Sequence, residues 1–159
     1  MRTRRGQAMV ETVLAVFFIT LIFYGLFELS RMITARILVD HAAARAARAK
    51  AVGFNDFMCL KSARVALIPV AGKRLWPVGV NGWNEVSRVP IYLSSENEAQ
   101  ARGILDYEWW NTTDISISSG AGLGATSRCD ISLETDDYEM EGQAEVESHY
   151  PLYMFNQGN

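Results

Sequence analysis

The sequence has few of the residues that enzymes use for catalysis or for metal binding. Its only histidines are His41 and His149, and neither lies in a cluster of candidate ligands or near a triad-like set. No cysteine and histidine spacing matches a zinc site. The glycine-rich stretch 120–124 is not followed by the Lys-Ser/Thr of a P-loop. We therefore predict neither an enzyme nor a bound cofactor or metal.

Proline is absent between Gln7 and Val52, and Gly25 is the only glycine there. Alanine, arginine and leucine, which are good helix formers, dominate the second half of this segment. Gly53 follows directly, and glycine commonly occupies the position after a helix C-terminus. The sequence thus predicts one long helix over residues 8–52.

The first half of this helix is a membrane-type segment. The uncharged stretch Thr12–Phe27 has 16 residues, slightly fewer than the roughly 20 that cross a bilayer. Residues 8–10 and a neutralised Glu11 would make it long enough. Arginines precede the stretch, so the positive-inside rule places the N-terminus in the cytoplasm and the rest of the chain outside.

A secretory signal peptide also combines basic residues with an apolar run. Here the residues that follow the run, Glu28–Arg31, contain no clear small-x-small cleavage pattern. Glu11 lies inside the start of the run, where a carboxylate in hydrocarbon is energetically costly. A secreted protein that begins after Ser30 stays open as an alternative.

The run Arg4–Glu11 (RRGQAMVE) resembles the processing site of type IV-like prepilins. A short basic leader ends in Gly6, and Glu11 is the fifth residue if Gln7 is counted as the first. The resemblance implies that a prepilin peptidase cuts between Gly6 and Gln7. Glu11 would then pair with the freed α-amino group of a neighbouring subunit, because either charge left alone in a low-dielectric filament core is costly. The alternative is that Glu11 only reaches toward the headgroups and the leader arginines.

The resemblance extends to the TadE-like family of tight-adherence (Flp-type) pseudopilins. It is carried by Gln7–Glu11, Phe27–Arg31, the Ala/Arg tract His41–Val52 and, more weakly, Val146–Leu152. Thr12 departs from the phenylalanine that usually follows the glutamate, which leaves the subtype open.

This family implies a structural pilus subunit whose partners are itself, other pilins, the peptidase, the inner-membrane assembly platform and, before assembly, the membrane. It implies a single pass in the inner membrane, followed by a place in an extracellular pilus or a periplasmic filament base. The chain is much longer than the major tight-adherence pilin, which favours a minor pseudopilin, although the main filament subunit stays open. An uncleaved, membrane-anchored binding module of a secretion or pilus assembly machine is the alternative.

Charge is distributed unevenly along the chain. Residues 1–74 contain twelve Lys/Arg and four Asp/Glu, whereas residues 75–159 contain three and fourteen. Because the arginines follow a membrane-type segment, we interpret them as a solvated helix face with packing partners of opposite sign. We do not expect a nucleic acid partner.

The predicted organisation is a leader at 1–6, a long helix at 7–53 and an extracytoplasmic head at 54–159. The fold class is α+β, with a small antiparallel sheet on the long helix. Residues 54–74 predict a short amphipathic helix, and residues 75–103 predict loops with a brief strand at Val89–Leu93. Further strand candidates are Ile104–Trp110, Asp114–Ser118, Ser127–Glu134 and Gln143–Tyr150.

The head contains the two cysteines of the chain, Cys59 and Cys129. In an oxidising compartment they can pair in only one way. The bond would close a loop of about 70 residues and contribute roughly 4 kcal/mol in the chain-entropy model. The alternative is two free thiols in a reducing compartment. The acidic run Glu134–Glu147 predicts a solvated loop rather than a calcium site, because it lacks EF-hand spacing.

Overall fold

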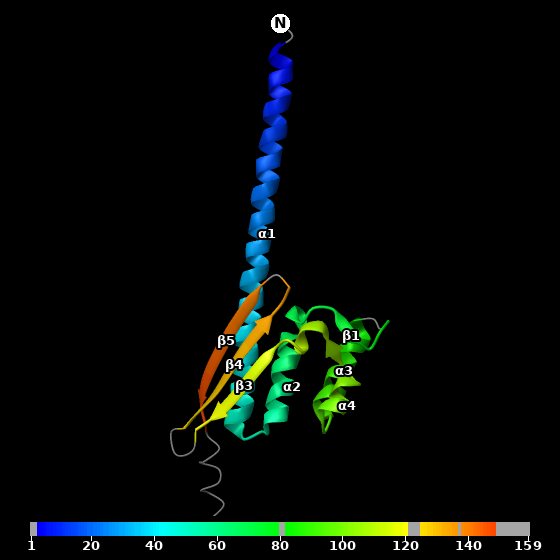
Figure 1. The fold of residues 1–159 in the computed structure, drawn as a ribbon, viewed down its shortest axis with the longest axis vertical. Coiled ribbons are helices and arrows are strands. Elements are labelled where there is room, and N and C mark those ends of the chain that lie inside the picture. The colour runs from blue at the N-terminus through cyan, green and yellow to red at the C-terminus, as the bar shows by residue number, and fades with distance from the viewer. Residues whose placement is uncertain (1–2, 80–81, 121–124, 137, 149–159) are drawn as a thin grey trace, which may run out of the picture. The chain divides into compact units, whose positions relative to one another are not determined.

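The computed structural model describes residues 3–79, 82–120, 125–136 and 138–148 (Figure 1). The chain divides into two compact units, Met1–Thr34 and Ala35–Asn159. The first unit is helical, and the second combines helices with antiparallel sheets. The predicted α+β class, with a long N-terminal helix and small antiparallel sheets, is confirmed.

Helix α1 (Thr3–Val52) begins earlier than the sequence predicts and ends where it predicts. Gly53 has a positive φ of 99°. Its N–H donates to the Lys50 carbonyl at 2.9 Å, and the Phe54 N–H donates to the Ala49 carbonyl at 3.2 Å. These two bonds form a Schellman motif, which satisfies carbonyls that the helix end would otherwise leave unpaired. The chain then enters α2 (Asp56–Leu67), whose N-cap is Asn55.

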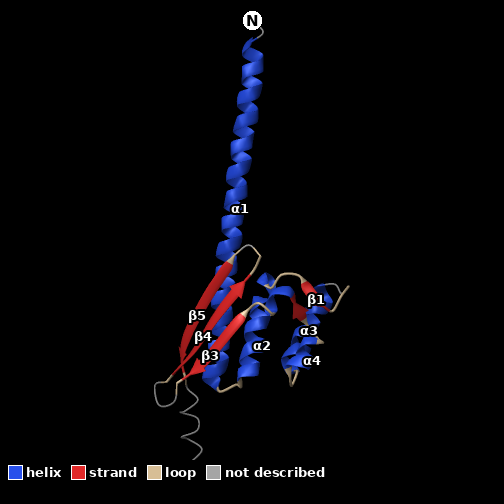
Figure 2. Ribbon diagram, in the orientation of Figure 1, coloured by secondary structure: helices blue, strands red, loops and turns tan. Residues whose placement is uncertain are grey.

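The main sheet has the strand order β3 (Asp114–Ser119), β4 (Thr126–Glu134) and β5 (Glu139–Glu147), all antiparallel. Figure 2 shows these three strands side by side. Side chains alternate along each strand between a buried face and an exposed face. The buried face packs against small and branched residues of α1 and α2. Strand and helix residues together form the first core: Ala35, Val39, Ala42, Ala43, Ala46, Ala47, Ala63, Ala66, Leu67, Cys129, Ile131, Leu133 and Met140.

Alanines on α1 allow the sheet to approach the helix closely, and Gly142 of β5 completes the fit. A Cβ added at Gly142 would lie 2.7 Å from Val39 Cγ1 and 3.0 Å from the Asp40 backbone nitrogen. The strand therefore lies almost on the helix backbone, where only glycine fits.

A second core lies among the remaining elements of the head. These are the 3-10 turns η1 (Ile68–Val70) and η2 (Glu108–Trp110), helices α3 (Gly82–Ser94) and α4 (Glu98–Arg102), and the short pair β1 (Arg74–Trp76) and β2 (Asp106–Tyr107). Trp110 is buried at its centre, with ring centroids 5.3 Å from Tyr92 and 4.8 Å from Tyr107. Aromatic pairs at these distances add to the burial of their apolar area.

Several predictions in the head were wrong. Val89–Leu93 belongs to α3 and is not a strand, because the burial of Tyr92 in the second core outweighs the helix-breaking tendency of Pro90. Of the predicted strand Ile104–Trp110, only Asp106–Tyr107 is extended. Most of the acidic run Glu134–Glu147 is strand β5 rather than a loop, since its glutamates alternate with residues that face the core. The end of the predicted strand Gln143–Tyr150 lies outside the described residues.

Candidate assembly site

The described residues of the first unit belong to α1, and their apolar side chains are exposed. Every large apolar side chain between Met9 and Ile33 is 45–74% exposed. Residues Gln7–Val52 of α1 contain an apolar window with a mean hydropathy of 2.2, none of it buried. By length and composition, this helix is able to cross a membrane.

The polar side chains of the same segment differ in whether they have a hydrogen-bond or ion-pair partner. The hydroxyls of Thr12 and Thr20 each donate to the carbonyl four residues earlier, at 2.9 Å. Arg31 pairs with Glu28 one turn away at 3.3 Å. Glu11 is exposed, and within the described part of the chain it has neither a hydrogen bond nor an ion pair. A carboxylate in an apolar helix without a partner among the described residues is in a costly state in hydrocarbon.

The predicted processing residues lie at the start of the same helix. The backbone at Gly6 and Gln7 is helical, and Gln7 is exposed. The structure therefore places Gly6, Gln7 and Glu11 on one continuous helical segment. Whether the chain is cut between Gly6 and Gln7 stays a prediction.

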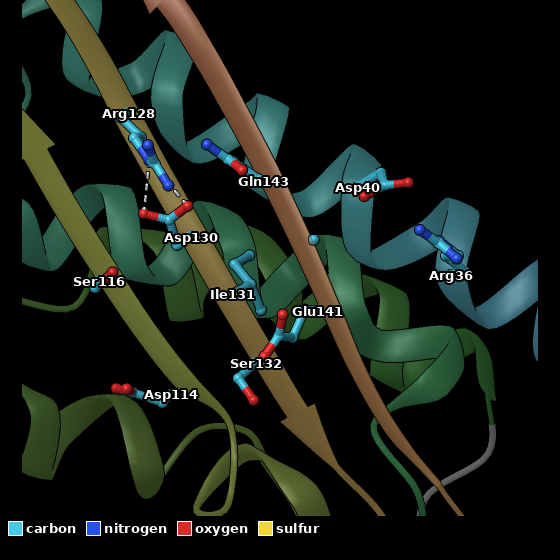
Figure 3. A pocket seen from close by; sticks show the side chains of 11 residues that line it. Arg36, Asp40, Asp114, Ser116, Arg128, Asp130, Ile131, Ser132, Glu141 and Gln143 are labelled. Atoms are coloured by element: carbon cyan, nitrogen blue, oxygen red, sulfur yellow. Dashed lines mark hydrogen bonds and ion pairs between the residues drawn. The ribbon is translucent and has the colours of Figure 1, made fainter.

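The exposed face of the main sheet is polar and contains a cavity of about 540 Å³ (Figure 3). Arg128 Nε pairs with the Asp130 carboxylate at 2.9–3.0 Å, and this pair lies over β4 between Ser116 and Gln143. The guanidinium is exposed, and its hydrogen bond to Asp130 raises the pKa of Arg128. No group of three metal-ligating side chains occurs among the residues that the structure describes.

The two cysteines lie on α2 and β4, as the sequence predicts, and both are free and completely buried in the structure. Burial raises the pKa of the Cys129 thiol to about 11, and the charge of Asp130 and the neighbouring Cys59 add to the shift. Burial also raises the pKa of Cys59. At neutral pH both groups are therefore protonated and unreactive. Their pairing stays a prediction.

Lys61 of α2 is a buried charge that sequence reasoning missed. Its ammonium donates to the carbonyls of Leu93 and Ser95, at 2.6 and 2.7 Å, and lies 4.6 Å from the centroid of the Phe57 ring. Burial lowers the pKa of this group. Because the carbonyls at a helix C-terminus lack intrahelical donors, Lys61 caps α3 and links it to α2.

These observations define a class of protein with a membrane-capable N-terminal helix and an α+β head. The comparison with protein families is more specific: residues 6–48 match the family described as TadE-like protein (TadE). The resemblance predicted from the N-terminal motifs is thus confirmed over this segment. It suggests a subunit associated with a Tad pilus, anchored by its helix, that interacts with other pilus components. No curated protein and no solved structure gives a significant match.

Proposed function

We propose that this chain is a structural subunit of a Tad-type pilus that is cut after Gly6 by a prepilin peptidase and assembles through α1. A minor pseudopilin is the favoured form, and the main filament subunit is the alternative form. The observation that carries the proposal is the exposed apolar surface of α1, with the unpartnered Glu11 near its start. The match to TadE-like proteins covers this same segment.

The physical argument concerns what can surround α1. An exposed apolar helix needs lipid or the helices of other subunits around it. The hydrocarbon of a bilayer supplies no cation for Glu11, whereas a processed neighbour in a filament supplies an α-amino group with a pKa of roughly 7.7–8.0. Filament assembly therefore buries the apolar surface of α1 and also gives the Glu11 carboxylate a cationic partner. It also fixes the axial position of one subunit against the next.

Replacement of Gly6 tests the processing step. In cells with an active prepilin peptidase, we expect Gly6→Leu to leave the full-length precursor, and the wild type to lose about six residues, as read by intact mass or N-terminal sequencing. Gly25→Leu is the matched control, because a Cβ at Gly25 meets no atom within 4 Å and the position lies away from the leader. A Gly6→Leu chain that is still shortened would contradict the processing step.

Replacement of Glu11 tests the assembly step separately. We expect Glu11→Gln to be processed at the normal site but to appear in sheared filaments at less than about a tenth of the wild-type amount, because an unpaired α-amino group in the filament core is costly. Thr20→Val is the control, since the Thr20 hydroxyl bonds only to its own helix. Normal incorporation of Glu11→Gln would overturn the proposed role of this carboxylate.

The alternative function is an uncleaved, single-pass membrane-anchored binding module of a secretion or pilus assembly machine. The folded head with its polar sheet face favours this reading, since such a face can bind a partner without polymerisation. A wild-type chain that keeps its leader in cells with an active peptidase, and is absent from sheared filaments, would support it.

A further inference from the structure

The exposed side of the main sheet is strongly acidic. Residues directly opposite in neighbouring strands share a face, and the pairs Thr126–Glu147, Arg128–Glu145 and Ser132–Glu141 place these glutamates together on the exposed side. We call this surface the acidic sheet face. Its carboxylates are Asp114, Asp130, Glu134, Glu139, Glu141, Glu145 and Glu147. Arg128 is the only cation on the described residues of its three strands, and Arg36 of α1 lines the cavity on this face.

The acidic sheet face has unfavourable electrostatics in the isolated chain. Glu134 lies directly opposite Glu139, and like charges in such positions destabilise a sheet. Arg128 is already paired with Asp130. Within the described residues, Glu141 and Glu147 have neither an ion pair nor a side-chain hydrogen bond. A partner that brings cations would therefore relieve repulsion as well as add attraction.

The opposite side of the same unit carries cations. Ala35, Val39, Ala42, Ala43, Ala46 and Ala47 turn one face of α1 toward the sheet. The opposite face of the helix is exposed at Ile37, His41, Arg45, Arg48 and Val52, which follow one another at spacings of three and four residues. We call this surface the basic helix stripe. Among the described residues, Arg45 and Arg48 have no ion-pair partner.

The two surfaces cannot neutralise each other within one chain, because the sheet and α1 pack together through their other faces. We propose that the acidic sheet face of one copy binds the basic helix stripe of a second copy, with Glu145 and Glu147 against Arg45 and Arg48. The spacings fit: two residues of a strand advance by about 6.8 Å, and three residues of a helix advance by about 4.5 Å, a difference that long side chains accommodate.

The symmetry of this contact matches a filament. Two different surfaces on opposite sides of one unit make a heterologous contact, which leaves one acidic face and one basic stripe free at the ends of every assembly. Such a contact repeats without limit unless the rotation closes a ring. The inference rests on the proposed function only in requiring several copies in one assembly, because the contact itself involves the head and not the processed N-terminus.

Cross-linking of the purified full-length chain in detergent tests the contact. One population carries Arg48→Cys and a differently tagged population carries Glu145→Cys, and a short bismaleimide is added to the mixture. The native cysteines are buried, so the wild type serves as the background. We expect a mixed dimer with this pair, and at least about tenfold less when Glu96→Cys, an exposed position away from the sheet, replaces Glu145→Cys. Equal yields from both pairs would overturn the inference.

Charge exchange provides the second test, since it separates electrostatics from folding. We expect Arg45→Glu/Arg48→Glu and Glu145→Arg/Glu147→Arg each to weaken self-association about tenfold or more, because like charges then oppose each other. The four substitutions combined in one chain should restore it. If the combined variant self-associates no more strongly than either double variant, and circular dichroism shows that all three are folded, the inference is overturned.

An anionic membrane surface is the competing partner for the basic helix stripe. Binding of the wild type to anionic vesicles that Arg45→Glu/Arg48→Glu abolishes, without self-association of the head, would assign the stripe to the membrane and would overturn the inference. The cross-linking and charge-exchange experiments use unprocessed protein without peptidase. An uncut chain with normal head contacts would therefore contradict only the processing step of the proposed function.

Discussion

Gly142 offers the most direct test of how β5 packs on α1. An alanine Cβ at this position would lie 2.7 Å from Val39 Cγ1, 2.9 Å from the Val39 carbonyl carbon and 3.0 Å from the Asp40 nitrogen. The methyl group of Val39 can move, but the other two atoms belong to the helix backbone. The strand or the helix must therefore shift by several tenths of an ångström, and overpacking of a core usually costs about 1–3 kcal/mol.

We expect Gly142→Ala to lower the free energy of unfolding of the head by about 2 kcal/mol. The assay is urea unfolding of the full-length chain in detergent, followed by tryptophan fluorescence, because Trp109 packs against the first core. Val39→Ala in the same chain removes the 2.7 Å contact but leaves the two backbone contacts. It should therefore recover only part of the loss.

Gly103→Ala is the matched control. A Cβ at Gly103 would meet its nearest atom, the Gln100 carbonyl oxygen, at 3.5 Å, which is ordinary van der Waals contact. The φ of Gly103 is −69°, which any residue can adopt. We expect this substitution to be neutral or to stabilise the head by up to about 1 kcal/mol. Equal stability of Gly142→Ala and the wild type would refute the close packing of β5 on α1.

Two further predictions concern buried side chains of the head. Lys61→Met leaves the Leu93 and Ser95 carbonyls without their donor and should cost about 1–3 kcal/mol in urea unfolding. Because burial lowers the Lys61 pKa, the unfolded chain binds more protons between the folded pKa and the ordinary value of 10.5, so wild-type stability from this group should rise with pH in that range. For the cysteines, we expect protein isolated from an oxidising compartment to show no alkylated thiol after denaturation without reductant.

Each of these predictions has a result that would contradict it. A Lys61→Met chain with wild-type stability, or with the same rise of stability with pH, would show that Lys61 is not the group responsible. Two alkylated thiols in the denatured protein, at Cys59 and Cys129, would exclude the disulfide. After reduction, native thiols should react slowly at pH 7, since burial raises the Cys129 pKa to about 11. Fast reaction would contradict their burial.

Local sequence was sufficient to predict an element where the same residue preference continues along its whole length. An uninterrupted run of helix formers specifies α1, and Gly53 ends it because the αL conformation suits glycine. The alternation of apolar and polar residues specifies β3 and β4, since one face of the sheet must be buried. The TadE-like resemblance came from Gln7–Glu11, Phe27–Arg31 and the Ala/Arg tract His41–Val52, and it is confirmed over residues 6–48.

Tertiary structure decided the features for which local preferences conflict. Pro90 disfavours a helix, yet α3 forms around it because Tyr92 is buried in the second core. The glutamates of β5 suggest a loop when they are counted as charges, but hydrogen bonds to β4 and the core-facing Met140 make the segment a strand. The sequence alone determined that this chain has an apolar helical stem with a glutamate near its start. Only the packing of the head decided that Lys61 is buried, that Gly142 touches α1, and that opposite charges occupy opposite sides of one unit.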